Sequence, residues 1–281
     1  AEDRQRGEPG GLAGLVDGHV VADATERSAD RPVEGLGAVA RDQGAIADDV
    51  DHRERQDDAR REHQRWWQLE PELADAHYSL GLLLAENEAR LDEASGFLGT
   101  ATELMPENPR VHYNLGLAYQ KTGRFHLAEE AYLKAVEIDP GLAEAWVNLG
   151  GVRLHNWDFE GCLKASKMAV SQRDDLAMAH YNLGQAFLYM NDPDNLVACN
   201  KRVIELERDN AAAHYYAAVG LLAVGDLTGA ERHAGRAMEL GHRPTQEFLR
   251  ALEKAQRAGA EARLSVVEIA GEENPEKPKE D

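Results

Sequence analysis

Residues 109–142 read PRVHYNLGLAYQKTGRFHLAEEAYLKAVEIDPGL, and the Leu-Gly pair in this stretch recurs at a fixed spacing along the chain. The pairs Leu115-Gly116, Leu149-Gly150 and Leu183-Gly184 are each 34 residues apart, and Leu80-Gly81 stands 35 residues before the first. A period of this size is typical of structural units that cannot bury their apolar faces alone and therefore stack. The sequence predicts a repeat protein whose neighbouring units pack side by side.

Each unit has the pattern of two antiparallel helices. In residues 109–142 two segments carry apolar or small side chains at helical spacing, with Gly123 between them as the turn and Pro140 as the stop of the second helix. These side chains are Leu115, Ala118, Tyr119, Ala128, Ala131, Tyr132 and Ala135. Gly116 and Ala128 are small, which lets two helix axes approach to about 8–10 Å. We therefore expect one helical hairpin per unit.

Five such units follow in phase, at residues 74–108, 109–142, 143–176, 177–210 and 211–244. The pattern, which includes Trp146-x-x-Leu149-Gly150, resembles the tetratricopeptide repeat family over residues 74–244. The resemblance implies an all-α fold, a right-handed α-solenoid of helix-turn-helix repeats. The units depart from the family pattern where Arg153 replaces an aromatic residue, Cys162 an alanine, Asp174 and Arg208 the closing proline, and Ala217-Ala218 the Leu-Gly pair. The first unit also has one extra residue, around Glu88–Leu91.

The segment before the repeats has a different composition. No Phe, Tyr, Trp, Cys, Met or Lys precedes Trp66, so this stretch has few side chains with which to build a core. We expect residues 1–58 to be disordered or not native coding sequence. Residues 59–73 keep the spacing of one eroded repeat helix, a degenerate half-repeat.

After the repeats, residues 245–263 place Phe248, Leu249 and Leu252 on one face, which predicts a C-terminal capping helix. Residues 264–281 form an acidic tail, which begins with the apolar run Leu264–Ile269. We expect the part of the tail after this run to be disordered.

The net charge is -20, from 31 Lys and Arg against 51 Asp and Glu. This balance disfavours a nucleic-acid partner, because binding to phosphates depends on clustered Lys and Arg. No apolar run is long enough to span a membrane, and the first residues lack the layout of a secretory signal. The two cysteines are too few for a disulfide framework. We expect a cytoplasmic protein without membrane insertion, and the removal of an N-terminal signal stays open.

An asparagine directly precedes three of the Leu-Gly pairs: Asn114, Asn148 and Asn182. Since the first helix of each unit lines the inner side of such an array, these residues would form a ladder with a step of about 10 Å. Each carboxamide could then pair with one peptide group of an extended ligand. Since such a ligand rises about 3.3 Å per residue, the asparagines would meet it at roughly every third residue. The alternative is that these asparagines only cap or hydrate their neighbours. Ser79 and Tyr216 interrupt the ladder at its ends.

Tyrosines stand one residue before the asparagine position, at Tyr78, Tyr113, Tyr181 and Tyr215, with Val147 as the exception. They are candidate anchors for a peptide ligand, because a phenol offers a large contact area and loses little entropy. Packing within the array is an equally good interpretation. Arg110, Lys121, Arg153 and Gln185 are candidates for polar selectivity, although a solvated surface explains each of them singly.

Four histidines also share one position per unit, at His77, His112, His180 and His214. Ligands of zinc lie about 2 Å from one centre, whereas these rings would repeat at about 10 Å, so packing is the favoured interpretation and we expect no metal or other cofactor. No nucleophile-base arrangement or phosphate loop is present, and we expect no enzyme activity. Within the resembling family some members hold a partner's C-terminal carboxylate with a basic clamp. Met178 and Asn182 stand where that clamp needs basic residues.

Three hypotheses about function follow. The preferred one is a non-catalytic protein-protein interaction scaffold that binds an extended segment of a protein partner in a groove centred on units two to four. The alternative is self-assembly into a homo-oligomer through the terminal repeats, with Trp66, Trp67 and the run Leu264–Ile269 as docking surfaces. In the third hypothesis this run folds back into the groove as an internal ligand.

Overall fold

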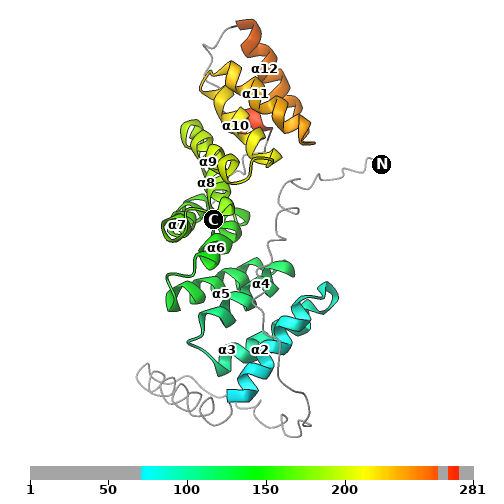
Figure 1. Ribbon diagram of the computed structural model, residues 1–281, viewed down its shortest axis with the longest axis vertical. Helices are drawn as coiled ribbons and strands as arrows, with labels where there is room; N and C mark the ends of the chain where they lie inside the picture. The colour runs from blue at the N-terminus through cyan, green and yellow to red at the C-terminus, as the bar shows by residue number, and fades with distance from the viewer. Residues whose placement is uncertain (1–70, 259–264, 272–281) are drawn as a thin grey trace, which may run out of the picture. The chain divides into compact units, whose positions relative to one another are not determined.

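The computed structural model of the protein describes residues 71–258 and 265–271 (Figure 1). The regular structure in these ranges is helical, and successive helices pack as hairpins. The first helices of the hairpins are α2 (Pro71–Ala85), α4 (Pro109–Lys121), α6 (Ala143–His155), α8 (Ala177–Tyr189) and α10 (Ala211–Ala223). The second helices are α3 (Leu91–Leu104), α5 (Phe125–Ile138), α7 (Phe159–Gln172), α9 (Pro193–Leu206) and α11 (Leu227–Glu239). The predicted all-α solenoid of helical hairpins is confirmed.

Three shorter or flanking helices complete the described chain. The 3-10 helix η1 (Glu88–Arg90) lies where the first unit has its extra residue, and α12 (Gln246–Ala258) and α13 (Val266–Ala270) follow the last hairpin. No helix in the described ranges is long and apolar enough to cross a membrane. The predictions for residues 1–58, for Trp66 and Trp67, and for most of the half-repeat concern residues outside these ranges.

The glycines of the Leu-Gly pairs lie where the two helices of a hairpin touch. A Cβ added to Gly116 would stand 2.6 Å from Cε1 of Tyr132, which is closer than side chains approach one another. The same close approach joins Gly81 to Leu98, Gly150 to Ser166 and Gly184 to Asn200. In the fifth unit Ala218 replaces the glycine, and the equivalent position of α11 carries the small Ala234. A larger residue on one helix is thus matched by a smaller one on the other, as close packing requires.

In four of the five turns between the paired helices, one residue has a left-handed backbone. These residues are Gly123, Trp157, Asn191 and Gly225, with φ of 73°, 62°, 56° and 87°. Glycine adopts this conformation without steric cost, whereas a residue with a Cβ loses roughly 1–2 kcal/mol. Trp157 packs edge-on against the rings of Phe159 and Tyr189, and these contacts offset part of the steric cost.

The seams between units are closed by a repeated hydrogen bond. Near the start of a first helix, a ring nitrogen of each of four residues lies 2.9–3.1 Å from the backbone carbonyl six residues earlier. The pairs are His112 with Pro106, Trp146 with Pro140, His180 with Asp174, and His214 with Arg208. This contact gives a hydrogen-bond partner to a backbone carbonyl in the turn after the preceding helix. It gives three of the four histidines on the shared position a structural role.

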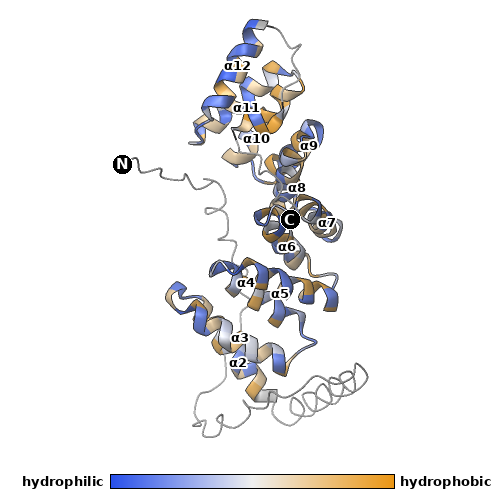
Figure 2. Cartoon of the chain, turned by 180° about the vertical axis from the view of Figure 1, so that it is seen from behind, coloured by the Kyte–Doolittle hydropathy of each residue, from blue (hydrophilic) through white to orange (hydrophobic). Residues whose placement is uncertain are grey.

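The first helices also contact one another across the unit boundaries. Besides its contacts within the hairpins, α2 packs against α4, and α8 packs against both α6 and α10. The side chains of neighbouring first helices can therefore meet directly, which places the candidate tyrosines and asparagines within reach of one another. At the C-terminal end α12 packs against α10 and α11, and hydrophilic residues recur along its length (Figure 2).

Candidate functional site

The asparagines of α4 and α6 reach back to the tyrosines of the preceding unit. Nδ2 of Asn114 donates to the hydroxyl of Tyr78 at 2.7 Å and to the carbonyl of Arg110 at 2.9 Å. Nδ2 of Asn148 donates to the hydroxyl of Tyr113 at 3.3 Å. All four side chains are half-buried. We call the surface formed by Tyr78, Tyr113, Asn114 and Asn148 the Tyr–Asn face.

The two phenols of the Tyr–Asn face keep their protons. Burial raises the pKa of Tyr78 and of Tyr113 above the ordinary tyrosine value, and the hydrogen bond from the asparagine opposes this shift. A neutral phenol that accepts one hydrogen bond still has its own O–H to donate. Each pair therefore combines a hydroxyl donor with the carbonyl acceptor of the asparagine.

Asn182 has the same place in its unit and a different environment. Only 4% of its surface is exposed, and its Nδ2 donates to the backbone carbonyl of Val147 at 3.0 Å. Val147 stands at the tyrosine position, so α6 offers no hydroxyl there. The glycines 150 and 151 of α6 leave room for Asn182, whose Nδ2 would lie 3.4 Å from a Cβ on Gly150.

Tyr181 and Tyr215 are also buried, at 6% and 3% exposed. The hydroxyl of Tyr215 lies 3.0 Å from Oγ1 of Thr245 and donates to the carbonyl of Ala270 at 3.2 Å. Its ring packs against the rings of His242 and Phe248. Tyr215 thus lies inside the C-terminal packing, and Tyr181 lies in the core that it forms with Val203 and Ala213.

The polar candidate residues also divide into exposed and buried ones. Arg110 and Lys121 are exposed on α4, the helix that carries Tyr113 and Asn114. Arg153 instead forms an ion pair with Glu129 at 2.9 Å between two half-buried side chains, which ties α6 to α5. Gln185 is 5% exposed, and its Nε2 has no hydrogen-bond partner within the described ranges. As ligand contacts, all of these residues remain predictions.

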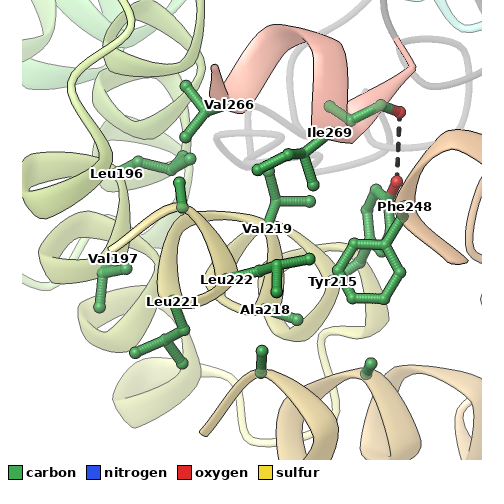
Figure 3. Close-up of a cluster of buried hydrophobic side chains, with 14 of the residues drawn as sticks. Leu196, Val197, Tyr215, Ala218, Val219, Leu221, Leu222, Phe248, Val266 and Ile269 are labelled. Carbon is green, nitrogen blue, oxygen red and sulfur yellow. Dashed lines mark hydrogen bonds between the residues drawn. The ribbon is translucent and has the colours of Figure 1, made fainter. Parts of the chain in front are cut away.

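The apolar run at the C-terminus packs against the repeats as α13. Its residues Val266, Val267, Ile269 and Ala270 are buried, and α13 contacts α8, α10 and α12 (Figure 3). The backbone N–H of Val266 donates to Oδ1 of Asn191 at 3.0 Å. Sequence patterns gave no signal for Asn191 or Thr245, since both act through contacts between distant parts of the chain. The apolar side chains of residues 265–269 are thus covered by their own chain.

The described residues hold little that is typical of catalysis. Burial raises the pKa of the Cys162 thiol to about 12 and that of Cys199 to about 11, so neither is an activated nucleophile. Across residues 71–258 and 265–271, no three His, Cys, Asp or Glu side chains gather as a metal site would need. The chemistry offered by the Tyr–Asn face is neutral hydrogen bonding next to aromatic surface.

Comparison with family models supports the repeat assignment. The tetratricopeptide repeat model matches residues 109–142, and a second TPR repeat model matches residues 90–123. Among curated proteins, the chain is similar to protein O-mannosyl-transferase TMTC3 of Homo sapiens, at 31% identity over 86 residues, which is 31% of this chain and 9% of the relative. TMTC3 of Mus musculus matches at 32% identity over 81 residues, 29% of this chain and again 9% of the relative. The chain thus spans less than a tenth of the length of these relatives.

Solved structures agree with the fold. The TPR protein YrrB superposes with a TM-score of 0.56 at 18% identity, over 69% of this chain and 97% of YrrB. MamA from Desulfovibrio magneticus RS-1 superposes with a TM-score of 0.55 at 19% identity, over 59% of this chain and 94% of MamA. The hairpins in register and these neighbours agree on the fold, and residues 90–142 match models of the tetratricopeptide repeat.

Proposed function

We propose that this protein is a non-catalytic scaffold for protein-protein interaction, which binds an extended segment of a partner protein along the Tyr–Asn face. The observation that carries the proposal is the repeated pair of Asn114 with Tyr78 and Asn148 with Tyr113. The neighbour YrrB, described as a TPR protein with an unusual peptide-binding site, supports a peptide ligand for this fold. The proposed site covers units one to three, because Asn182, Tyr181 and Tyr215 are buried.

The pairs offer the hydrogen-bonding groups that a peptide backbone needs. The tyrosine O–H can donate to a peptide carbonyl, and Oδ1 of the asparagine can accept from a peptide N–H. With units about 10 Å apart, an extended chain would present one peptide group to each pair at about every third residue. Contacts of this kind bind the backbone and tolerate variation in sequence, while the exposed Arg110 and Lys121 favour a segment with acidic side chains.

A peptide selection tests this function without a known partner. A phage-displayed library of random 12-residue peptides would be selected on the full chain, and a selected peptide would be labelled for fluorescence anisotropy. Replacement of Asn114 and Asn148 together by alanine should weaken its binding at least tenfold, because two backbone hydrogen bonds at about 1 kcal/mol each are lost. Circular dichroism should report unchanged helicity.

Asn182→Ala is the matched control. It removes the same side chain from the same repeat position, but from a buried contact with Val147. It should lower stability and leave peptide affinity within about threefold of the wild type. Unchanged affinity in the double variant would remove the Tyr–Asn face from the proposal. Growth of the particle mass with concentration in light scattering, with no peptide added, would favour self-assembly instead.

A further inference from the structure

At the C-terminal end of the repeats, α13 packs on α8, α10 and α12. We propose that the surface of α8, α10 and α12 around Asn191, Tyr215 and Phe248 is a recognition site for a short apolar helical segment. In this proposal α13 is an exchangeable ligand in cis, and a partner protein's segment of the same chemistry displaces it. The inference rests on the proposed role as an interaction scaffold and adds the kind of segment that is bound.

The two polar contacts of the site lie at the two ends of α13. Oδ1 of Asn191 accepts from the N–H of Val266, the first residue of the helix, and Tyr215 donates to the carbonyl of Ala270, the last. These are groups that a helix cannot satisfy within itself. Both contacts engage backbone atoms, so they select for a helix of five residues, about 7.5 Å long, without reading its side chains.

Side-chain selection comes from the apolar floor between these ends. Val266 and Ile269 share one core with Leu196, Val219 and Phe248 (Figure 3). Glu268 points to solvent and is exposed. The segment that fits has apolar residues at the positions of Val266, Val267 and Ile269, any polar residue between them, and a small residue at the last position.

The shortness of α13 makes it an occupant that can leave. A helix of five residues has no stability of its own in water, so α13 keeps its structure only while it is docked.

The test uses the full chain and a synthetic peptide. The variant carries Val266→Asp together with Ile269→Asp, which should expel α13 because two charges cannot be buried without partners. The probe is the labelled peptide SVVEIAG, the sequence of residues 265–271. It should bind this variant at least tenfold more tightly than the wild type, in which α13 already fills the site. Equally weak binding to both chains would overturn the proposal.

Matched controls separate docking from general damage. Glu268→Ala changes the exposed residue of the same helix and should leave peptide binding as weak as in the wild type. The peptide with Ile269→Asp should not bind the doubly substituted chain. Tyr215→Phe, added to that chain, should weaken binding of SVVEIAG several-fold by removing one terminal hydrogen bond.

A second measurement needs no variant. In hydrogen exchange of the wild type, the amide of Ile269 should exchange at least tenfold faster than that of Val219 on α10, because α13 opens without the repeats. Equal protection of the two amides would make α13 a fixed part of the core and overturn the proposal. If the double variant loses its helicity, this measurement on the wild type decides instead. A dimer of the wild type that SVVEIAG dissociates would identify a second copy as the occupant and overturn the partner assignment. Neither experiment involves Asn114 or Asn148, so failure here leaves the test of the Tyr–Asn face intact.

Discussion

The tyrosine-asparagine dipeptide occurs in identical positions of α4 and α8, yet the two copies lie in different surroundings. On α4, Tyr113 and Asn114 are half-buried, and both take part in contacts along the Tyr–Asn face. On α8, Tyr181 and Asn182 are almost fully buried. One repeat position therefore serves different structural roles in different units. The neighbouring helices decide whether its side chain stays half-exposed or fills a core.

The largest loss of stability should come from a substitution in the buried packing around α12 and α13. Phe248→Ala removes a fully buried ring that packs against Tyr215 beside α13. We expect a loss of about 3–5 kcal/mol in the free energy of unfolding, since a large cavity remains. Urea unfolding followed by circular dichroism measures it. Leu249→Ala, at the next and 40% exposed residue, should cost less than about 1 kcal/mol. Similar losses for both would show that α12 is not packed as described.

Alanine substitutions of Asn114 and Asn182 compare the half-buried and the buried asparagine directly. Asn182→Ala leaves the buried carbonyl of Val147 without its donor and should cost about 2 kcal/mol. Asn114→Ala removes a half-buried contact and should cost less than about 1 kcal/mol, because water can replace the amide at the hydroxyl of Tyr78. Thermal unfolding of the two variants side by side measures the difference. Equal costs would mean that the two positions are equivalent after all.

The smallest effect is a dependence on pH. Burial lowers the pKa of His112, His155, His233 and His242, and the charge of neighbouring His214 adds to the effect on His233. The neutral rings are favoured in the folded state, so their stabilisation is complete above the unfolded value of 6.5 and is lost as the pH falls below it. The melting temperature should therefore be lower at pH 5.5 than at pH 7.5. His233→Gln should reduce this difference in melting temperature. An unchanged difference would mean that other groups cause the dependence on pH.

Much of the fold follows from particular residues. Gly116 and the residues in phase with it predict hairpins, because only a small residue allows the observed approach to Tyr132. The shared histidine position predicts packing, and His112, His180 and His214 do contact a carbonyl at the unit boundary. The departure at Arg153 could not be interpreted from the pattern, because its partner Glu129 comes from the preceding unit.

The candidate site was predictable only in part. The spacing puts Asn114 and Tyr78 in equivalent rows, but their hydrogen bond joins residues 36 positions apart and depends on how closely α2 and α4 pack. The burial of Tyr215 depends on α13, whose last carbonyl lies 55 positions away in the chain. No local pattern carries that information.

The repeated hairpins follow from local sequence signals, because helical periodicity, turn residues and close-packing glycines act over a few residues and recur every 34 residues. The tertiary structure alone decided which of the equivalent tyrosines and asparagines stay accessible. Exposure is a property of the surroundings, and here the surroundings include Val147 from the adjacent unit and a helix that returns from the end of the chain to cover α8 and α10.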